Sequence, residues 1–182
     1  MNKKYARLAA ITSLVVFVGV LVSQIYVAQT QAATLTSAKD TISDSRAGVA
    51  AIHTFTFTTP SATNIKTIDF QFCTTASSTC TAPTGMILTA SPTLGTVTGI
   101  GGTTYAATGT SATCTGTGNS ACTATLTVTT PAAQSNVAVT VPFNTGITNP
   151  STASTSFFVR ITTKDGGAAA IDSSTVAFAT LT

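Results

Sequence analysis

The chain of 182 residues contains no tryptophan and no glutamate, and it has a single histidine, His53. Without glutamate, paired-carboxylate glycosidase chemistry would have only five aspartates to draw on. A hydrolytic triad would have only His53 as its base, and the sequence contains no G-x-S-x-G motif that would mark a nucleophile. These absences predict a protein that is not an enzyme.

Residues that bind metals are also sparse. The four cysteines lack C-x-x-C spacing and have no histidine partners, which excludes a typical zinc site. Calcium could draw oxygen ligands from Asp40 with Asp44, or from Asp165 with Asp172, but neither pair lies in a dense acidic loop. We therefore expect neither a metal ion nor a cofactor.

Residues 1–32 have the pattern of an export signal. An uncharged apolar run, Leu8–Val22, follows three basic residues, and the small residues Thr30 and Ala32 stand where signal peptidase requires them. The prediction is a signal helix that is removed to leave a chain starting at Ala33. The alternative is an uncleaved membrane anchor, since the 21 residues of Leu8–Ala28 could span a bilayer. Both interpretations place the rest of the chain outside the cytoplasm, at the cell surface or in the extracellular space.

The net charge of +3 comes from this first segment. Beyond residue 32, five cations and five anions cancel: Lys39, Arg46, Lys66, Arg160 and Lys164 against Asp40, Asp44, Asp69, Asp165 and Asp172. Without a basic patch, we expect no nucleic-acid partner. A neutral surface with so few charges repels its own copies weakly, which favours self-association or a cell-surface partner. A membrane would be contacted only through the N-terminal segment, if that segment is retained.

The remaining 150 residues are enough for one domain, and their composition favours β-structure. Threonine, which suits a pleated surface, occupies 42 of the 182 positions. Large apolar and small polar residues alternate in His53–Thr58 and in Lys66–Phe72, the signature of half-buried strands. We expect these two runs to form a hairpin. Similar short runs follow at 86–89, 94–98, 103–107, 122–128, 137–143, 157–161 and 176–181. The pattern predicts an antiparallel β-sandwich of eight to nine strands with an immunoglobulin-like arrangement.

Residues 33–48 form the most charged stretch beyond the leader and precede the sandwich domain expected over residues 49–182. One interpretation is an edge strand whose charges are solvated. The other is an extension that adds to the sheet of a neighbouring subunit.

Four cysteines in an exported chain predict two disulfides, for which three pairings are possible. The short polar loops between Cys73 and Cys80 and between Cys114 and Cys122 favour local pairing. Closing loops of this length contributes about 2.5 kcal/mol per bridge in the chain-entropy model. The alternative joins Cys73 to Cys122 and Cys80 to Cys114, which would staple the two loops together.

Residues Thr34–Met86 contain a characteristic order of segments. It consists of TLTSAKDTISDSRAGVAAIHTFTFTTP, then IDFQFC, a short polar loop, a second cysteine and TAPTGM. This order of features resembles uncharacterised secreted β-sandwich surface proteins of ultra-small candidate-phylum bacteria. The resemblance implies a cell-surface or extracellular protein and brings no catalytic residues with it.

His53 shares the inward face of its strand with Phe55 and Phe57, but it opens that strand. We interpret it as a structural histidine at a rim that stays wet. Taken together, the sequence favours a non-enzymatic exported structural or adhesive protein that self-assembles. The alternative is a carbohydrate- or peptide-binding module whose site lies in the cysteine loops. The lack of tryptophan and the small number of tyrosines argue against this alternative, because sugar platforms usually use aromatic rings.

Overall fold

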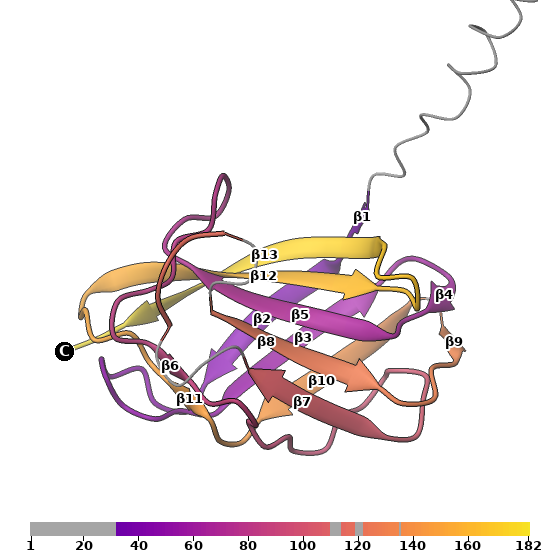
Figure 1. Ribbon diagram of the computed structural model, residues 1–182, viewed down its shortest axis with the longest axis horizontal. Coiled ribbons are helices and arrows are strands. Elements are labelled where there is room, and N and C mark those ends of the chain that lie inside the picture. The colour runs from indigo at the N-terminus through magenta and orange to yellow at the C-terminus, as the bar shows by residue number, and fades with distance from the viewer. Residues whose placement is uncertain (1–31, 110–113, 119–121, 135) are drawn as a thin grey trace, which may run out of the picture. The chain divides into compact units, whose positions relative to one another are not determined.

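The computed structural model describes residues 32–109, 114–118, 122–134 and 136–182 (Figure 1). The regular structure in these residues consists of strands, with no helix among them, which confirms the predicted all-β class. The predicted leader falls almost entirely outside the described residues. Within the described part of the chain, no helix has the length and apolar character needed to cross a membrane.

The larger sheet has six strands, and all its neighbouring pairs are antiparallel except the first, which is parallel. In spatial order the strands are β1 (Ala33–Thr34), β13 (Ala170–Thr180), β12 (Thr155–Lys164), β5 (Thr67–Cys73), β8 (Thr123–Val128) and β7 (Tyr105–Gly109). The sheet thus joins the first described strand directly to the last.

The smaller sheet has three antiparallel strands and lies behind the larger sheet in the view of Figure 1. Its order is β10 (Val137–Phe143), β3 (His53–Thr59) and β2 (Thr36–Ile42). Two short pairs complete the described strands: β6 (Ile87–Leu88) with β11 (Ile147–Thr148), and β4 (Thr63–Asn64) with β9 (Ala133–Gln134).

The two alternating runs near the start of the domain do not form the expected hairpin. β3 belongs to the three-stranded sheet and β5 to the six-stranded sheet, so the two strands face each other across the core. The rings of Phe55 and Phe70 lie 4.6 Å apart, centroid to centroid. Each run has one face of large apolar residues, and burying those faces against each other removes more apolar surface from water than pairing edge to edge would. The strands that pair with β3 are instead β2, which precedes it in the chain, and β10, about eighty residues later.

The core between the sheets is rich in phenylalanine. The most buried rings, each at most 2% exposed, are Phe55, Phe57, Phe70, Phe72 and Phe143. Along β3 the residues alternate strictly between buried and half-buried, as a period-2 pattern requires. Burying each of these side chains contributes about 1.5–3 kcal/mol, so the alternating phenylalanines carry much of the driving force for the fold.

The segment 94–98, predicted to be a strand, makes only isolated bridges. Leu94 pairs with Phe143 and Thr98 with Thr140, so this segment lies along the outer edge of β10. Gly99 has a φ of +78°, and a Cβ at this position would overlap the carbonyl oxygen of Ala138. Such a close approach of two backbones bends the segment away from regular pairing. The segment nevertheless covers an edge that would otherwise be open for association.

The N-terminal segment passes from one sheet to the other. β1 pairs in parallel with β13, and the backbone N–H of Leu35 donates to the carbonyl of Ser173 at 3.0 Å. Leu35 itself is buried, and the chain then continues as β2 at the edge of the three-stranded sheet. Residues 33–42 therefore form a strap, the name used below for this segment, that contacts both sheets.

Candidate functional site

The structure confirms local disulfide pairing. Cys73 is bonded to Cys80 and Cys114 to Cys122, with Cα atoms 5.1 and 4.8 Å apart, so the crossed alternative is wrong. All four cysteines are at least 95% buried. Each bridge closes a loop at the end of a strand, after β5 for the first and before β8 for the second.

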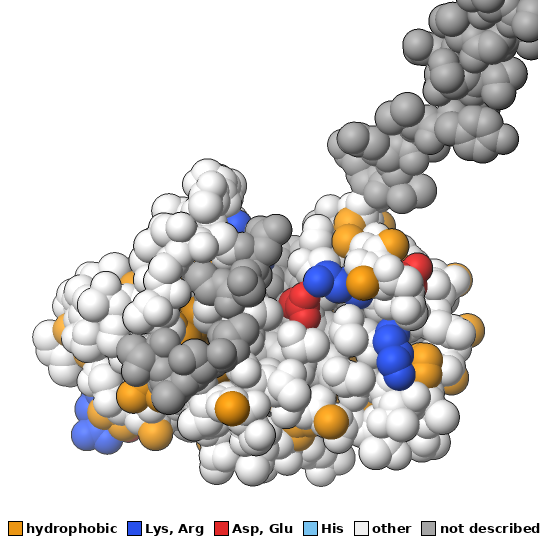
Figure 2. All heavy atoms as spheres, viewed as in Figure 1, with side chains coloured by type: hydrophobic (Ala, Val, Ile, Leu, Met, Phe, Trp, Pro, Cys, Tyr) orange, Lys and Arg blue, Asp and Glu red, His pale blue; other side chains and the backbone are white. Residues whose placement is uncertain are grey.

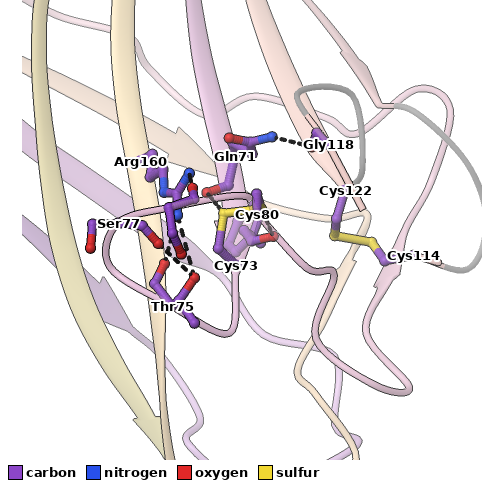
Figure 3. The surroundings of a disulfide bond; sticks show 11 residues. Gln71, Cys73, Thr75, Ser77, Cys80, Cys114, Gly118, Cys122 and Arg160 are labelled. Atoms are coloured by element: carbon purple, nitrogen blue, oxygen red, sulfur yellow. Dashed lines mark hydrogen bonds between the residues drawn. A yellow bond between two sulfur atoms is a disulfide. The ribbon is translucent and has the colours of Figure 1, made fainter. Parts of the chain in front are cut away.

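Although their disulfides are separate, backbone hydrogen bonds hold the two loops together. The N–H of Gly118 donates to the carbonyl of Cys80 at 2.8 Å, and Thr81 and Thr117 form an isolated β-bridge. The Gln71 side chain on β5 donates from Nε2 to the Gly118 carbonyl at 2.8 Å (Figure 3). Two segments some forty residues apart thus form one loop unit.

Arg160 on β12 braces the first cysteine loop from outside (Figure 3). Its guanidinium donates to the carbonyls of Ser78 at 2.8 Å and Thr75 at 3.1 Å. The outward parity of Arg160 is readable in the sequence, but its distance from the loop along the chain is too great for spacing to indicate the contact. It is a structural contact that sequence reasoning missed.

A shallow hollow of about 460 Å³ lies between the two loops. It is lined by Cys114 and by residues with small side chains, which come from the segment after the first loop and from the start of the second loop and include Thr81, Thr84, Thr115 and Thr117. Among the described residues that line it, there is no charged side chain and no aromatic ring. The loops therefore offer hydroxyl and backbone groups but little to fix a sugar or a peptide in one orientation.

His53 is fully buried, so the predicted wet rim is wrong. The side chains of His53 and Asp40 are both 0% exposed, and Nδ1 lies 2.8 Å from Oδ2 of the aspartate. The other ring nitrogen, Nε2, lies 3.2 Å from Oδ1 of Asn149. The imidazole also meets the rings of Phe72 and Phe178 edge-on, at 5.7 and 5.5 Å. The sequence could not show that β2 and the segment around residue 149 close over this end of β3.

The orientation of Asn149 fixes the role of the histidine. Its Nδ2 donates to the carbonyls of Asp44 at 2.8 Å and Arg46 at 3.0 Å, so its Oδ1 must face His53 and accept from Nε2. With Nδ1 against Asp40, both ring nitrogens are engaged. A general base needs a nitrogen free to take a proton from a nucleophile, and this imidazole has none to offer. The network instead links β2, β3 and the 44–46 segment.

The remaining aspartates also have protein partners. Asp44 binds Arg46 at 2.6 Å, and the side-chain and backbone hydrogen bonds from Arg46 lower the pKa of Asp44 from 3.8 to about 2. Hydrogen bonding to Asp44 in turn raises the pKa of the Arg46 guanidinium. Asp165 accepts from the N–H groups of Gly167 and Ala169 in the turn between β12 and β13.

The fourth aspartate considered for calcium, Asp172, accepts from the hydroxyl of Ser61 at 2.5 Å. Its partner in the predicted pair, Asp165, is occupied in a turn, and Asp40 and Asp44 are held by His53 and Arg46. Within the described residues, no group of three or more His, Cys, Asp or Glu side chains lies close enough to hold a metal ion.

A second hollow, of about 240 Å³, lies on the outer face of the six-stranded sheet. It is lined by Asp69, Gln71, Thr123, Thr162 and Lys164, which come from β5, β8 and β12. Two of these lining residues, Asp69 and Lys164, form an ion pair with Nζ 2.5 Å from Oδ2. Sequence reasoning missed this pair because the two residues lie 95 positions apart.

Comparison with known proteins adds no relative to this picture: no family model, no curated protein and no solved structure matches the chain. The resemblance to secreted surface proteins stays a prediction.

Proposed function

We propose that this chain is a non-enzymatic exported protein that acts at the cell surface as a structural or adhesive subunit and associates with its own copies. The observation that carries the proposal is the pair of buried local disulfides at the ends of β5 and β8. Disulfides of this kind form and persist in oxidising compartments, so they are compatible with an extracellular location. The export signal expected in residues 1–32 supports the same compartment.

The fold class that we propose is the immunoglobulin-like sandwich. In that arrangement two central strand pairs from different sheets face each other across the core. The pairing of β3 with β10 in one sheet and of β5 with β12 in the other is consistent with it. The strap, which passes from the six-stranded sheet to the three-stranded sheet, is a further point of support.

Self-association is supported by the outer face of the three-stranded sheet. The outward side chains of β3 are Thr54, Thr56 and Thr58, all half-buried, and Thr56 lies between Thr140 and Lys39 on its neighbours. This face, with one cation and many short side chains, has little charge to repel a second copy.

The strap offers a specific mode of association. Exchange of an identical segment between subunits needs no new contacts, because the exchanged segment makes the same contacts in the partner. Residues 33–42 contact both sheets through β1, the buried Leu35 and β2, and a turn at residues 47–48 follows them. We propose that this strap exchanges between neighbouring copies at the cell surface.

Export is tested by expressing the full chain in a bacterial host that forms disulfides outside its cytoplasm. We expect the protein in the exported fraction, with no thiol that reacts with iodoacetamide before reduction and four that react after it. A chain retained in the cytoplasm with four reactive thiols would overturn the proposed compartment.

Association is tested by light scattering and negative-stain microscopy, and strand exchange by cross-linking. Thr34 and Ser173 are register partners in β1 and β13, so Thr34→Cys with Ser173→Cys should give intermolecular disulfides if the strap is exchanged. The matched control is Thr155→Cys with Thr180→Cys, partners in the β12–β13 hairpin, which must cross-link within one chain. The assembly proposal would be contradicted if light scattering finds only monomers and both variants form only intramolecular cross-links.

A further inference from the structure

We propose that the outer face of the six-stranded sheet carries a binding site for one neutral, hydroxyl-rich unit, such as a single sugar ring, centred on Asp69 and Lys164. The site goes beyond the proposed structural role and does not depend on self-association. It also lies on a sheet face, away from the hollow between the cysteine loops.

The site is a recess built by three adjacent strands. Asp69 on the central strand β5 pairs in register with Thr125 of β8 on one side and with Thr162 of β12 on the other. The residues that line the hollow are half-buried or buried, although they lie on the outward face of the sheet. Figure 2 shows an acidic side chain beside a basic one in a hollowed part of this face, over β5 and β12.

The polar groups in the recess are held in place before any ligand arrives. Asp69 accepts from the Thr125 hydroxyl through Oδ1 at 2.7 Å and from Lys164 through Oδ2 at 2.5 Å. The Asp69 and Lys164 side chains keep 20% and 32% of their surfaces exposed. Gln71 is fixed by its Nε2 bond to the carbonyl of Gly118. Ordered side chains of this kind reduce the entropy that binding must remove.

Hydrogen-bonding capacity remains on all three groups. An ammonium group has three donors, and among the described residues Lys164 uses one of them. A carboxylate can accept about four hydrogen bonds, and the described partners of Asp69 use two. The carbonyl oxygen of the Gln71 amide has no partner within the described residues, because the bond to Gly118 uses its nitrogen. The recess therefore presents donors and acceptors side by side.

The balance of these groups selects the class of ligand. The charges of Asp69 and Lys164 cancel, so neither an anion nor a cation gains net attraction. The described residues that line the hollow include no aromatic or aliphatic side chain, which disfavours an apolar ligand and leaves hydrogen bonds, not ring stacking, to hold a sugar. A hydroxyl group both donates and accepts, so two neighbouring hydroxyls can satisfy the carboxylate and the ammonium at once.

The size of the recess limits the ligand to one unit. Pockets for drug-sized molecules begin at about 300 Å³, and this hollow holds about 240 Å³. A zwitterion such as a free amino acid would also match the two charges, but it would have to displace the 2.5 Å ion pair to reach them. Each direct hydrogen bond to a sugar replaces one to water, so we expect millimolar affinity for a single ring.

The experiment is a titration of the exported, ¹⁵N-labelled protein followed by NMR. The probes are D-glucose, D-galactose and N-acetyl-D-glucosamine, with glycine as the zwitterion and sodium phosphate as the anion. We expect at least one sugar to give saturable shifts at the Gln71 side-chain amide and at the backbone amides of residues 69–71 and 162–164. Pull-down on cellulose and chitin then distinguishes a chain-bound unit from a free monosaccharide as the source of the ligand.

Two kinds of variant test the assignment. Lys164→Met should weaken sugar binding by about tenfold or more, because a charge-assisted hydrogen bond is lost. Thr162→Leu should block the recess without touching the ion pair, since the described residues give the Thr162 side chain no hydrogen-bond partner. Lys39→Met, on the opposite sheet, is the matched control and should bind as the parent does. Thermal unfolding of each variant identifies any loss that comes from unfolding.

The proposal is overturned if no sugar shifts these resonances, or if glycine or phosphate shifts them as strongly as the sugars do. It is also overturned if Lys164→Met and Thr162→Leu remain folded and bind as the parent does. None of these results depends on the oligomeric state, so a monomer that binds sugar would contradict the proposed assembly and leave this site intact.

Discussion

Two carboxylates four residues apart, Asp40 and Asp44, experience opposite surroundings. Asp40 lies on β2 with its side chain 0% exposed, against a histidine that is also 0% exposed. Asp44 follows the strand with its side chain 28% exposed, against an arginine side chain that is 66% exposed. The distances are nearly the same, 2.8 and 2.6 Å. The two pairs therefore separate the effect of burial from the effect of contact distance.

The buried pair is expected to matter far more to stability than the exposed one. Removing one partner of a buried pair leaves a polar or charged group without compensation in a medium that solvates it poorly. Water solvates the exposed pair, so losing a partner there exchanges one favourable environment for another. A third pair, Asp69 with Lys164, lies between these extremes, with side chains 20% and 32% exposed.

The largest effect is expected when the buried pair is broken. Asp40→Leu should lower the free energy of unfolding by about 3–5 kcal/mol, because His53 then loses the partner of Nδ1 inside the core. Urea denaturation followed by circular dichroism measures the change. Adding His53→Phe to Asp40→Leu should recover a large part of the loss, since two apolar groups need no partners. A loss below about 1 kcal/mol for the single variant would show that burial does not determine how much this pair contributes to the free energy of unfolding.

The second effect concerns the amide that completes the buried network. Asn149→Ala removes the acceptor for His53 Nε2 and the donor to the carbonyls of Asp44 and Arg46. We expect a loss of about 1–3 kcal/mol for leaving such buried groups unpaired. The control is Asn144→Ala, an exposed asparagine after β10, which should change stability by less than about 0.5 kcal/mol. Equal losses in the two variants would contradict the role given to the network.

The buried network also shows where sequence reasoning ends. The alternation around Phe55 and Phe57 placed His53 on the inward face, and it is buried there. Whether that end of the strand is open depends on residues 40 and 149, and no periodicity relates those positions to residue 53. The same limit explains the wrong hairpin: alternation identified both β3 and β5, but which strands pair depends on how two apolar faces meet in space.

Local features were predictable because local chemistry decides them. Cysteines that are seven or eight positions apart close a small loop at little cost in chain entropy, so spacing favoured their local pairing. The brace from Arg160 to Ser78 and the recess around Asp69 and Lys164 both join residues more than eighty positions apart. One sequence contains no signal for such contacts, and the pair that centres the proposed sugar site was therefore missed.

The third effect concerns the partly exposed pair, Asp69 with Lys164, and its contribution to the free energy of unfolding. Lys164→Met should change the free energy of unfolding by about 0–1 kcal/mol, because both partners are partly exposed and the methionine keeps most of the aliphatic stem. The measurement is again urea denaturation, and Lys39→Met serves as a control without an ion pair among the described residues. A loss as large as that of Asp40→Leu would break the relation between exposure and stability.

The smallest effect on stability, and the clearest electrostatic signal, is expected at Asp44. Its carboxyl should titrate with a midpoint at about 2, below its ordinary value of 3.8, because the side chain and backbone N–H of Arg46 bind the ionised form. Between these two pH values the unfolded chain binds more protons than the folded one. The contribution of the pair to stability is therefore complete above about 4 and is lost as the pH falls through about 2. Carbon-13 NMR of the carboxyl group measures the midpoint.

Arg46→Gln distinguishes the two causes of this shift. It removes the side-chain hydrogen bonds, the larger cause, and keeps the backbone N–H that also donates to Asp44. The midpoint should therefore rise toward 3.8 without fully reaching it, while unfolding at neutral pH stays close to that of the parent because the pair is exposed to water. An unchanged midpoint would assign the low pKa to the backbone alone. A marked loss of stability at neutral pH would mean that an exposed pair contributes as much to the free energy of unfolding as we expect of the buried pair. That result would contradict the proposed difference between Asp40 and Asp44.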